Sequence, residues 1–192
     1  MRYGILALAA SAIAALPSYS QVTVIGGGMA KDCYEAAETT RLTASEAIEV
    51  CDNALKFETL TRNDRVSTLI NRGILHMRTG NYRYSMNDYE TAIRLSPDKA
   101  EAYLNMGANY IYQEEYDLAK EVLDKAINLG TDDLFAAYYN RGIANERIGD
   151  ITSAYWDFRK SLDLNPEFEI AERQLERFIV TEEPGNAGGA PV

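Results

Sequence analysis

Histidine, cysteine and long apolar runs are scarce in this 192-residue chain, and each shortage excludes a class of protein. The longest apolar run, residues 5–16, is shorter than the roughly 20 residues that a membrane-spanning helix needs. One histidine, His76, and two cysteines leave too few ligands for a zinc site of ordinary composition, and the histidine reads as packing filler. Phosphate-binding loops, G-x-S-x-G motifs and calcium-loop spacing do not occur. The sequence therefore predicts no catalytic residues, no metal site and no cofactor, and hence no enzyme.

Basic residues are also in short supply. The chain has 19 Lys and Arg against 29 Asp and Glu, which gives a formal net charge of -10. Nucleic acids and anionic membranes attract clustered positive charge, so neither is an expected partner. The acidity favours solubility and, weakly, a basic protein partner.

The first 20 residues have the organisation of a signal peptide. Arg2 precedes the apolar run, and Ser18-Tyr19-Ser20 offers a small-x-small cleavage site. We expect cleavage after Ser20, so that the mature chain begins at Gln21 and is exported, to the periplasm or out of the cell, with no stable membrane span. The alternative is an uncleaved leader that acts as an N-terminal anchor. About 170 residues would remain, enough for one domain with a buried core.

Export makes a disulfide chemically available to Cys33 and Cys51. Leu42 is their midpoint, within a stretch where the chain must turn, and residues equidistant from a turn between two helices lie at equal height. The pair can therefore meet and clamp an N-terminal hairpin. A redox role is the alternative, but the C-x-x-C spacing that lowers a thiol pKa is absent.

A repeat organises the centre of the chain. Gly73, Gly107 and Gly142 lie 34 and 35 residues apart in the blocks NRGILH, NMGANY and NRGIAN. Further along each unit, a small residue is followed four positions later by a large one. Pro97 and Pro166 close the first and third units. Glycine in a helix interior costs about 1 kcal/mol relative to alanine, so its recurrence indicates that two helices touch there. The small and large pairs are Ser85 with Tyr89, Ala119 with Leu123 and Ala154 with Phe158.

These blocks resemble the tetratricopeptide repeat (TPR), a helix-turn-helix unit with a similar period and a pattern of W-x2-L-G-x2-Y, A-x3-F and P. The overall style is similar to that of small periplasmic TPR proteins of bacteria. The resemblance implies an all-α solenoid. We expect the following organisation: a signal peptide at 1–20, a flexible leader at 21–29, a degenerate helical hairpin at 30–65, repeats at 66–99, 100–134 and 135–168, a capping helix at 169–180 and a disordered tail at 181–192.

The resemblance also implies where a partner would bind. Asn71, Asn105 and Asn140 share one position in the three units, and in the family that position faces a concave groove. An amide donates and accepts at once, so such a file of asparagines can bind the backbone of an extended peptide. The alternative is helix-to-helix bonding within the scaffold. By the same register, further groove candidates are Ile74, Arg78, Tyr112, Tyr139 and Arg147.

The resemblance narrows the kind of partner. TPR domains that hold the acidic tails of chaperones use a clamp of lysines, arginine and asparagines, and of that clamp only Asn105 matches here. We therefore predict a non-enzymatic scaffold or adaptor that binds an extended segment or helix of another protein. The alternatives are a self-associating homo-oligomer of the cell envelope and an enzyme with an unrecognised site.

Overall fold

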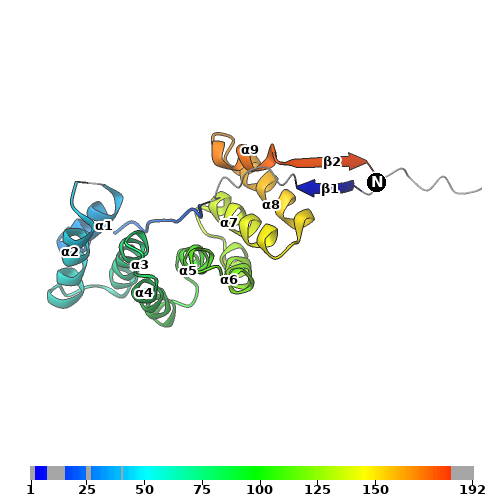
Figure 1. The fold of residues 1–192 in the computed structure, drawn as a ribbon. Helices are drawn as coiled ribbons and strands as arrows, with labels where there is room; N and C mark the ends of the chain where they lie inside the picture. The colour runs from blue at the N-terminus through cyan, green and yellow to red at the C-terminus, as the bar shows by residue number, and fades with distance from the viewer. Residues whose placement is uncertain (1–2, 8–15, 25–26, 40, 183–192) are drawn as a thin grey trace, which may run out of the picture.

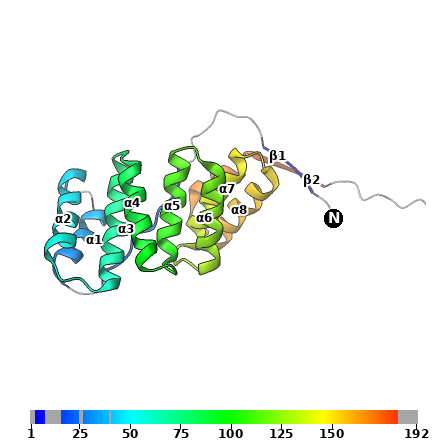
Figure 2. The same cartoon turned by 90° about the horizontal axis from the view of Figure 1, so that it is seen from below.

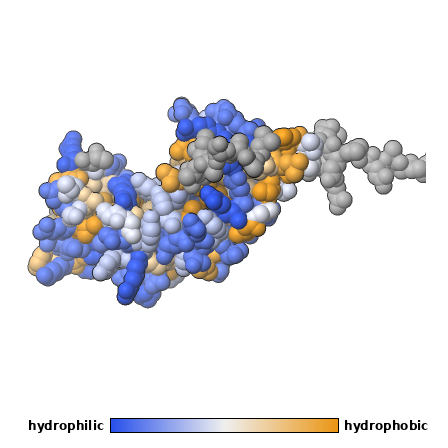
Figure 3. Space-filling model, viewed as in Figure 1, coloured by the Kyte–Doolittle hydropathy of each residue, from blue (hydrophilic) through white to orange (hydrophobic). Residues whose placement is uncertain are grey.

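The computed structural model describes residues 3–7, 16–24, 27–39 and 41–182. Within those residues, eight of the nine helices form four antiparallel hairpins stacked side by side, and the ninth packs on the last hairpin (Figures 1 and 2). The stack is hollowed on one side (Figure 3). The all-α class is confirmed, with one two-stranded sheet added to it. The elements are β1 (Tyr3–Ala7), α1 (Met29–Glu38), α2 (Ala44–Phe57), α3 (Arg62–Arg78), α4 (Tyr82–Leu95), α5 (Ala100–Tyr112), α6 (Tyr116–Leu129), α7 (Leu134–Arg147), α8 (Ile151–Leu164), α9 (Glu169–Leu175) and β2 (Phe178–Glu182).

Each repeat hairpin closes on its glycine. A Cβ atom added to Gly107 would lie 2.5 Å from Cγ of Leu123, and one added to Gly142 would lie 2.8 Å from Cδ1 of Phe158. Gly73 faces Tyr89 in the same way. The expected contact between the two helices of each unit is therefore present, and only a residue without a side chain allows it.

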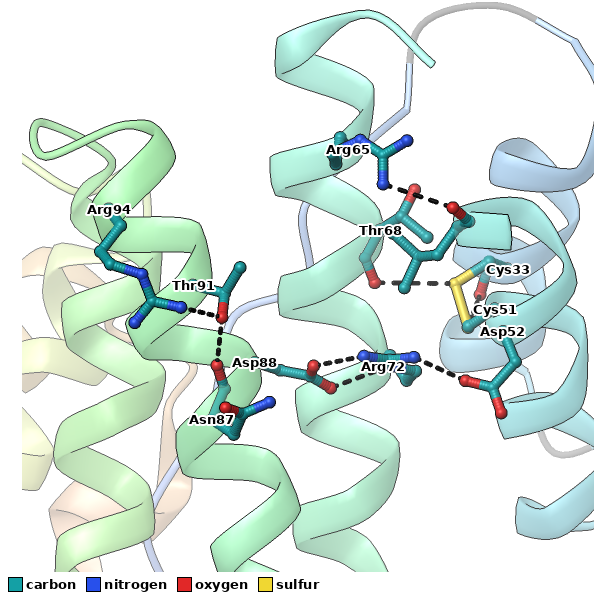
Figure 4. Close-up of polar contacts among 11 residues, drawn as sticks. Cys33, Cys51, Asp52, Arg65, Thr68, Arg72, Asn87, Asp88, Thr91 and Arg94 are labelled. Atoms are coloured by element: carbon teal, nitrogen blue, oxygen red, sulfur yellow. Dashed lines mark hydrogen bonds and ion pairs between the residues drawn. A yellow bond between two sulfur atoms is a disulfide. The ribbon is translucent and has the colours of Figure 1, made fainter. Parts of the chain in front are cut away.

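Ion pairs join neighbouring hairpins next to these contacts. Arg72 on α3 donates to Asp88 on α4, at 2.5 and 3.0 Å, and to Asp52 on α2, at 2.6 Å (Figure 4). Burial raises the pKa of the Asp88 carboxyl, and the bonds from Arg72 oppose that rise. Arg141 repeats the arrangement with Asp157 and Asp124 in the third unit.

The N-terminal hairpin is closed by a disulfide between Cys33 on α1 and Cys51 on α2, whose Cα atoms are 4.7 Å apart, which is the pairing that the sequence predicts. Thr43 and Glu46 form a capping box at the start of α2. The next helix begins earlier than expected, at Arg62 instead of residue 66. The reason is local, since the Thr61 side chain accepts a hydrogen bond from the backbone N–H of Asp64 and so caps α3.

The C-terminal end differs from the prediction. The capping helix ends at Leu175 and does not run to residue 180, because Phe178–Glu182 forms β2, which pairs antiparallel with β1. The run Ile179-Val180-Thr181 is β-branched and suits a strand. Two residues of the predicted disordered tail, 181 and 182, belong to β2, and the other ten lie outside the described residues.

Two kinds of feature are absent from the described ranges. No helix there is long and apolar enough to cross a bilayer. Histidine, cysteine, aspartate and glutamate side chains do not gather there in any group of three or more that could hold a metal ion.

The three repeat turns suggest a first test. Gly80 and Gly149 adopt φ of 74° and 87°, and Glu114, at the equivalent place in the second repeat, adopts φ of 63°. A left-handed backbone costs a residue with a side chain about 1 kcal/mol or more. We therefore expect Glu114→Gly to raise the free energy of unfolding by about 1 kcal/mol, measured by chemical denaturation. Gly149→Ala is the matched control and should lower it by a similar amount; equal stability of parent and Glu114→Gly would contradict the argument.

Candidate binding groove

An extended segment of the chain itself, residues 16–24, lies along the first helices of the three repeats. Figure 1 shows this stretch in blue, running across α3 and α5 to α7. Its N-terminal end lies at α7 and its C-terminal end at α3, so it runs opposite to the order of the repeats. We call residues 16–24 the leader segment and the surface that holds it the groove.

The three asparagines hold the backbone of this segment. Each side chain accepts a hydrogen bond on Oδ1 from the backbone N–H of one residue and donates from Nδ2 to the carbonyl oxygen of the same residue. Asn140 holds Ser18 at 2.7 and 2.5 Å. Asn105 holds Ser20 at 2.9 and 2.7 Å, and Asn71 holds Val22 at 3.0 and 2.8 Å. Six hydrogen bonds thus bind alternate residues of an extended chain.

Helix geometry explains why these asparagines face the groove. Each lies two residues before the glycine of its repeat, which on a helix is about 200° around the axis. The glycine faces the second helix of its own hairpin, so the asparagine faces away from it. Two residues of extended chain span about 6.8 Å, whereas packed helix axes lie 8–10 Å apart. The inward curvature of the stack brings the asparagines close enough to contact every second residue.

The leader side chains alternate in exposure. Ser20, Val22 and Val24 are buried, whereas Tyr19 and Thr23 are exposed. Val22 packs in the same apolar cluster as residues of α3, α4 and α5, and Val24 packs with Ala30 and Ala54 at the N-terminal hairpin. The prediction of a flexible leader at 21–29 is therefore wrong for residues 21–24, because Val22 and Val24 have apolar partners and Asn71 satisfies the backbone of Val22.

Two charged residues complete the contacts. Arg78 donates from Nε to the hydroxyl of Tyr19, at 3.1 Å, and its guanidinium lies 4.9 Å from the centre of that ring. The hydroxyl of Ser20 donates to the carboxylate of Asp133, in the loop before α7. Sequence reasoning missed Asp133. The available sign was the one-residue lengthening of the second repeat at residues 130–133.

The other predicted groove residues divide between the groove and the core. Ile74 is fully buried in the cluster that contains Val22. Tyr112 stacks on Tyr82 with ring centres 5.6 Å apart, and burial raises the pKa of its hydroxyl. Arg147 lies over the ring of Tyr116, at 5.8 Å, and has no polar contact with the described part of the leader segment.

Tyr139 is a correction. Its side chain is fully buried against Phe158 and Phe168, with ring centres 5.6 and 5.1 Å away, and burial raises the pKa of its hydroxyl to about 12. Phe168 lies just before α9, so the C-terminal cap covers this position. Tyr139 belongs to the core and not to the groove surface.

His76 packs between α3 and α4. The ring is half-buried and stacks on Tyr84 at 5.4 Å, and burial lowers its pKa. The residue fills space between α3 and α4, as the sequence predicts.

Stacked helical hairpins with a groove that holds an extended chain define a class, the α-helical solenoids. Family models agree on the repeat: one described as TPR repeat matches residues 73–111, and one described as Tetratricopeptide repeat matches residues 100–129 and 135–168. The chain is a tetratricopeptide repeat protein. This fold is generally a non-enzymatic module for protein–protein interaction.

Relatives of known sequence match only in part. The chain is 32% identical over 77 residues to Tetratricopeptide repeat protein 6 of Homo sapiens, covering 40% of this chain and 15% of that protein. It is 27% identical over 125 residues to FK506-binding protein-like of Mus musculus, covering 61% of this chain and 36% of that protein. The chain thus spans well under half the length of these relatives.

Solved structures show the same fold. MamA of Desulfovibrio magneticus RS-1, solved from residue 41 to its end, aligns with a TM-score of 0.62 and 22% identity, covering 78% of this chain and 82% of that solved chain. The second TPR domain of human RPAP3, solved in complex with an HSP70 peptide, aligns with a TM-score of 0.56 and 23% identity, covering 60% of this chain and 96% of that domain.

Amide hydrogen exchange, resolved by residue with NMR, tests the groove contacts. The amides of Ser18, Ser20 and Val22 donate to asparagine side chains, whereas those of Tyr19, Gln21 and Thr23 donate to no atom of the described ranges. Since exchange requires the hydrogen bond to open, we expect slow and fast amides to alternate along the segment in the full chain.

The matched control for this exchange experiment changes one clamp. Asn105→Ala should accelerate exchange at Ser20 more than at Val22, because only the Ser20 amide loses its acceptor. Uniform exchange rates over residues 18–23 would show that the segment is not held in this register.

Proposed function

We propose that this protein is exported and that its groove binds an extended segment of a partner protein through the backbone. The observation that carries the proposal is the set of six hydrogen bonds from Asn71, Asn105 and Asn140 to alternate residues of an extended chain. Such bonds do not depend on the side chains of the bound segment, so segments of different sequence can use them.

In this proposal, the leader segment of the chain itself fills the groove that a partner segment would bind. Cleavage after Ser20 would remove Ser18 from Asn140 and Ser20 from Asn105, and would leave Val22 on Asn71. The mature protein would present two unoccupied clamps beside one that its own chain fills. β1 would leave β2 in the same step, because Tyr3–Ala7 also precedes the expected cut.

Charge separates this binding mode from that of the chaperone-tail domains. The human RPAP3 domain was solved with an HSP70 peptide that ends in EEVD, an acidic segment. The present chain has a net charge of -10, and Asn105 alone matches the clamp that such domains use. Backbone recognition of a neutral or basic segment fits this chain better than recognition of an acidic tail.

Export can be tested separately. Intact-mass analysis of the protein recovered from the periplasm or medium should find a chain that begins at Gln21, as free or cyclised glutamine. Retention of Met1 in a membrane fraction would instead identify the leader as an anchor and refute the cleavage.

In-cell crosslinking and co-purification of the tagged protein test the groove. We expect the parent to capture a partner that Asn105→Ala/Asn140→Ala loses, because that variant lacks the two clamps that cleavage frees. Thermal unfolding of every variant is measured in parallel to show that the scaffold remains folded.

Asn109→Ala is the matched control for the crosslinking. Asn109 is a fully buried asparagine on the same helix as Asn105, but it donates to the carbonyl of Tyr82 at 3.0 Å and not to the leader segment. It should keep the partner. Retention of the partner by the double variant would refute the groove as the working surface, and recovery of this chain alone would favour self-association, in which one copy's leader occupies another copy's groove.

A further inference from the structure

Asp133 occupies the N-cap position of α7 but does not cap it. Aspartate at an N-cap usually accepts a hydrogen bond from a backbone N–H of the first turn. Here no such bond forms, and the carboxylate accepts the hydroxyl proton of Ser20 instead. The Asp133 side chain thus binds the segment in the groove instead of capping the helix.

The Ser20 position is closed to larger side chains. Ser20 is only 3% exposed, and its backbone is fixed by Asn105 from both N–H and C=O. The neighbourhood of Val22 and Thr23 is different, because a cavity of about 490 Å³ lies beside them and Thr23 is exposed. The groove therefore restricts side-chain size at the central clamp and tolerates a change near its C-terminal end.

The capping residue also differs between repeats. Lys99 is the N-cap of α5 and lines the cavity beside Thr23, whereas Asp133 is the N-cap of α7 and contacts Ser20. The asparagines are the same in all three repeats, but the loops before the first helices bring different charges to the groove.

We propose that Asp133 makes the groove selective for an extended segment with a small hydroxyl-bearing residue at the Asn105 clamp. The inference rests on the proposed function and adds the sequence pattern of the partner. A carboxylate accepts a hydrogen bond from a hydroxyl and repels a second carboxylate, and the buried site of Ser20 admits only a small side chain. The partner segment runs in the direction of the leader, with its N-terminal end at α7.

The test measures binding of fluorescently labelled peptides to the full, unprocessed chain with its own leader weakened. Ser20→Pro/Val22→Pro removes two of the three leader amides that donate to asparagines, and Gln21→Pro/Thr23→Pro is the matched control with the same number of prolines. A peptide with the sequence of residues 16–24 should bind the first variant and compete poorly with the intact leader of the control.

Peptide variants then separate selection from simple binding. Ser20→Ala in the peptide should weaken binding about tenfold, because a hydrogen bond to a charged group is lost. Ser20→Asp should weaken it by at least about a hundredfold, because the larger side chain also places a second carboxylate against Asp133. Ser20→Leu should prevent measurable binding, and Thr23→Leu, the same enlargement at the exposed position, should leave affinity within about twofold.

Replacing the carboxylate identifies Asp133 as the selecting residue. Protein carrying Asp133→Ser exchanges the two side chains, which removes the like charge and leaves the volume that the larger aspartate needs. It should bind the Ser20→Asp peptide about as tightly as the unchanged protein binds the unchanged peptide. If Ser20→Asp and the parent peptide bind equally well to protein with Asp133, the selection is refuted. If no peptide binds at all, the proposed function itself fails.

A measurement within the full chain covers the case in which the proline variant does not fold. Ser20→Asp in the leader should accelerate amide exchange at residues 18, 20 and 22, and Ser20→Asp/Asp133→Ser, which exchanges the two side chains, should restore slow exchange. Slow exchange in the single variant would overturn the proposal, because these substitutions leave the helix contacts of the scaffold unchanged.

Discussion

In each repeat, the glycine of the first helix contacts a large side chain of the second helix. The rest of this structure depends on that contact. Gly107 and Gly142 allow no Cβ atom against Leu123 and Phe158, so the two helices of each hairpin meet at one fixed height and rotation. A helix whose rotation is fixed presents every other position in a defined direction. The asparagine two residues earlier must then face the opposite side, and stacking the hairpins lines these asparagines up.

The row of asparagines provides hydrogen-bond partners for the buried backbone of the bound segment. An extended segment laid between helices removes its N–H and C=O groups from water, and each must find a partner. Asn71, Asn105 and Asn140 are themselves fully buried, so they too need partners, and an amide pairs with a peptide group in both directions. An empty groove would leave these side chains to water, whereas an extended chain satisfies both sides at once.

The features predicted from sequence are those that recur at a period or lie close together along the chain. The repeat spacing, the glycine contacts, the register of the asparagines and the Cys33–Cys51 hairpin all follow from helix geometry over tens of residues. The missed features are non-local. Ser18 and Asn140 are 122 positions apart, and the pairing of β1 with β2 joins the two ends of the described chain.

Two errors show why those distances matter. Residues 21–29 are predicted to be flexible because so short a segment cannot bury its own side chains, whereas Val22 and Val24 pack against residues of α1 to α5. The repeat register predicts Tyr139 in the groove because it assumes that another repeat follows. The third repeat is the last, and the turn that ends it folds Phe168 onto that tyrosine. A repeat rule fails first at the ends, where a cap replaces the next neighbour.

The leader and a partner segment, if the proposed function holds, compete on unequal terms. A segment joined to its site by a short linker acts at an effective concentration on the order of millimolar, and the leader is followed within five residues by α1. An intact leader with three clamps therefore excludes all but tight partners. The peptide bond after Ser20 is buried in that state, since Ser20 is only 3% exposed, so a peptidase must cut before the leader docks. Processing would then decide at the moment of export whether the groove closes on its own chain or remains open for another.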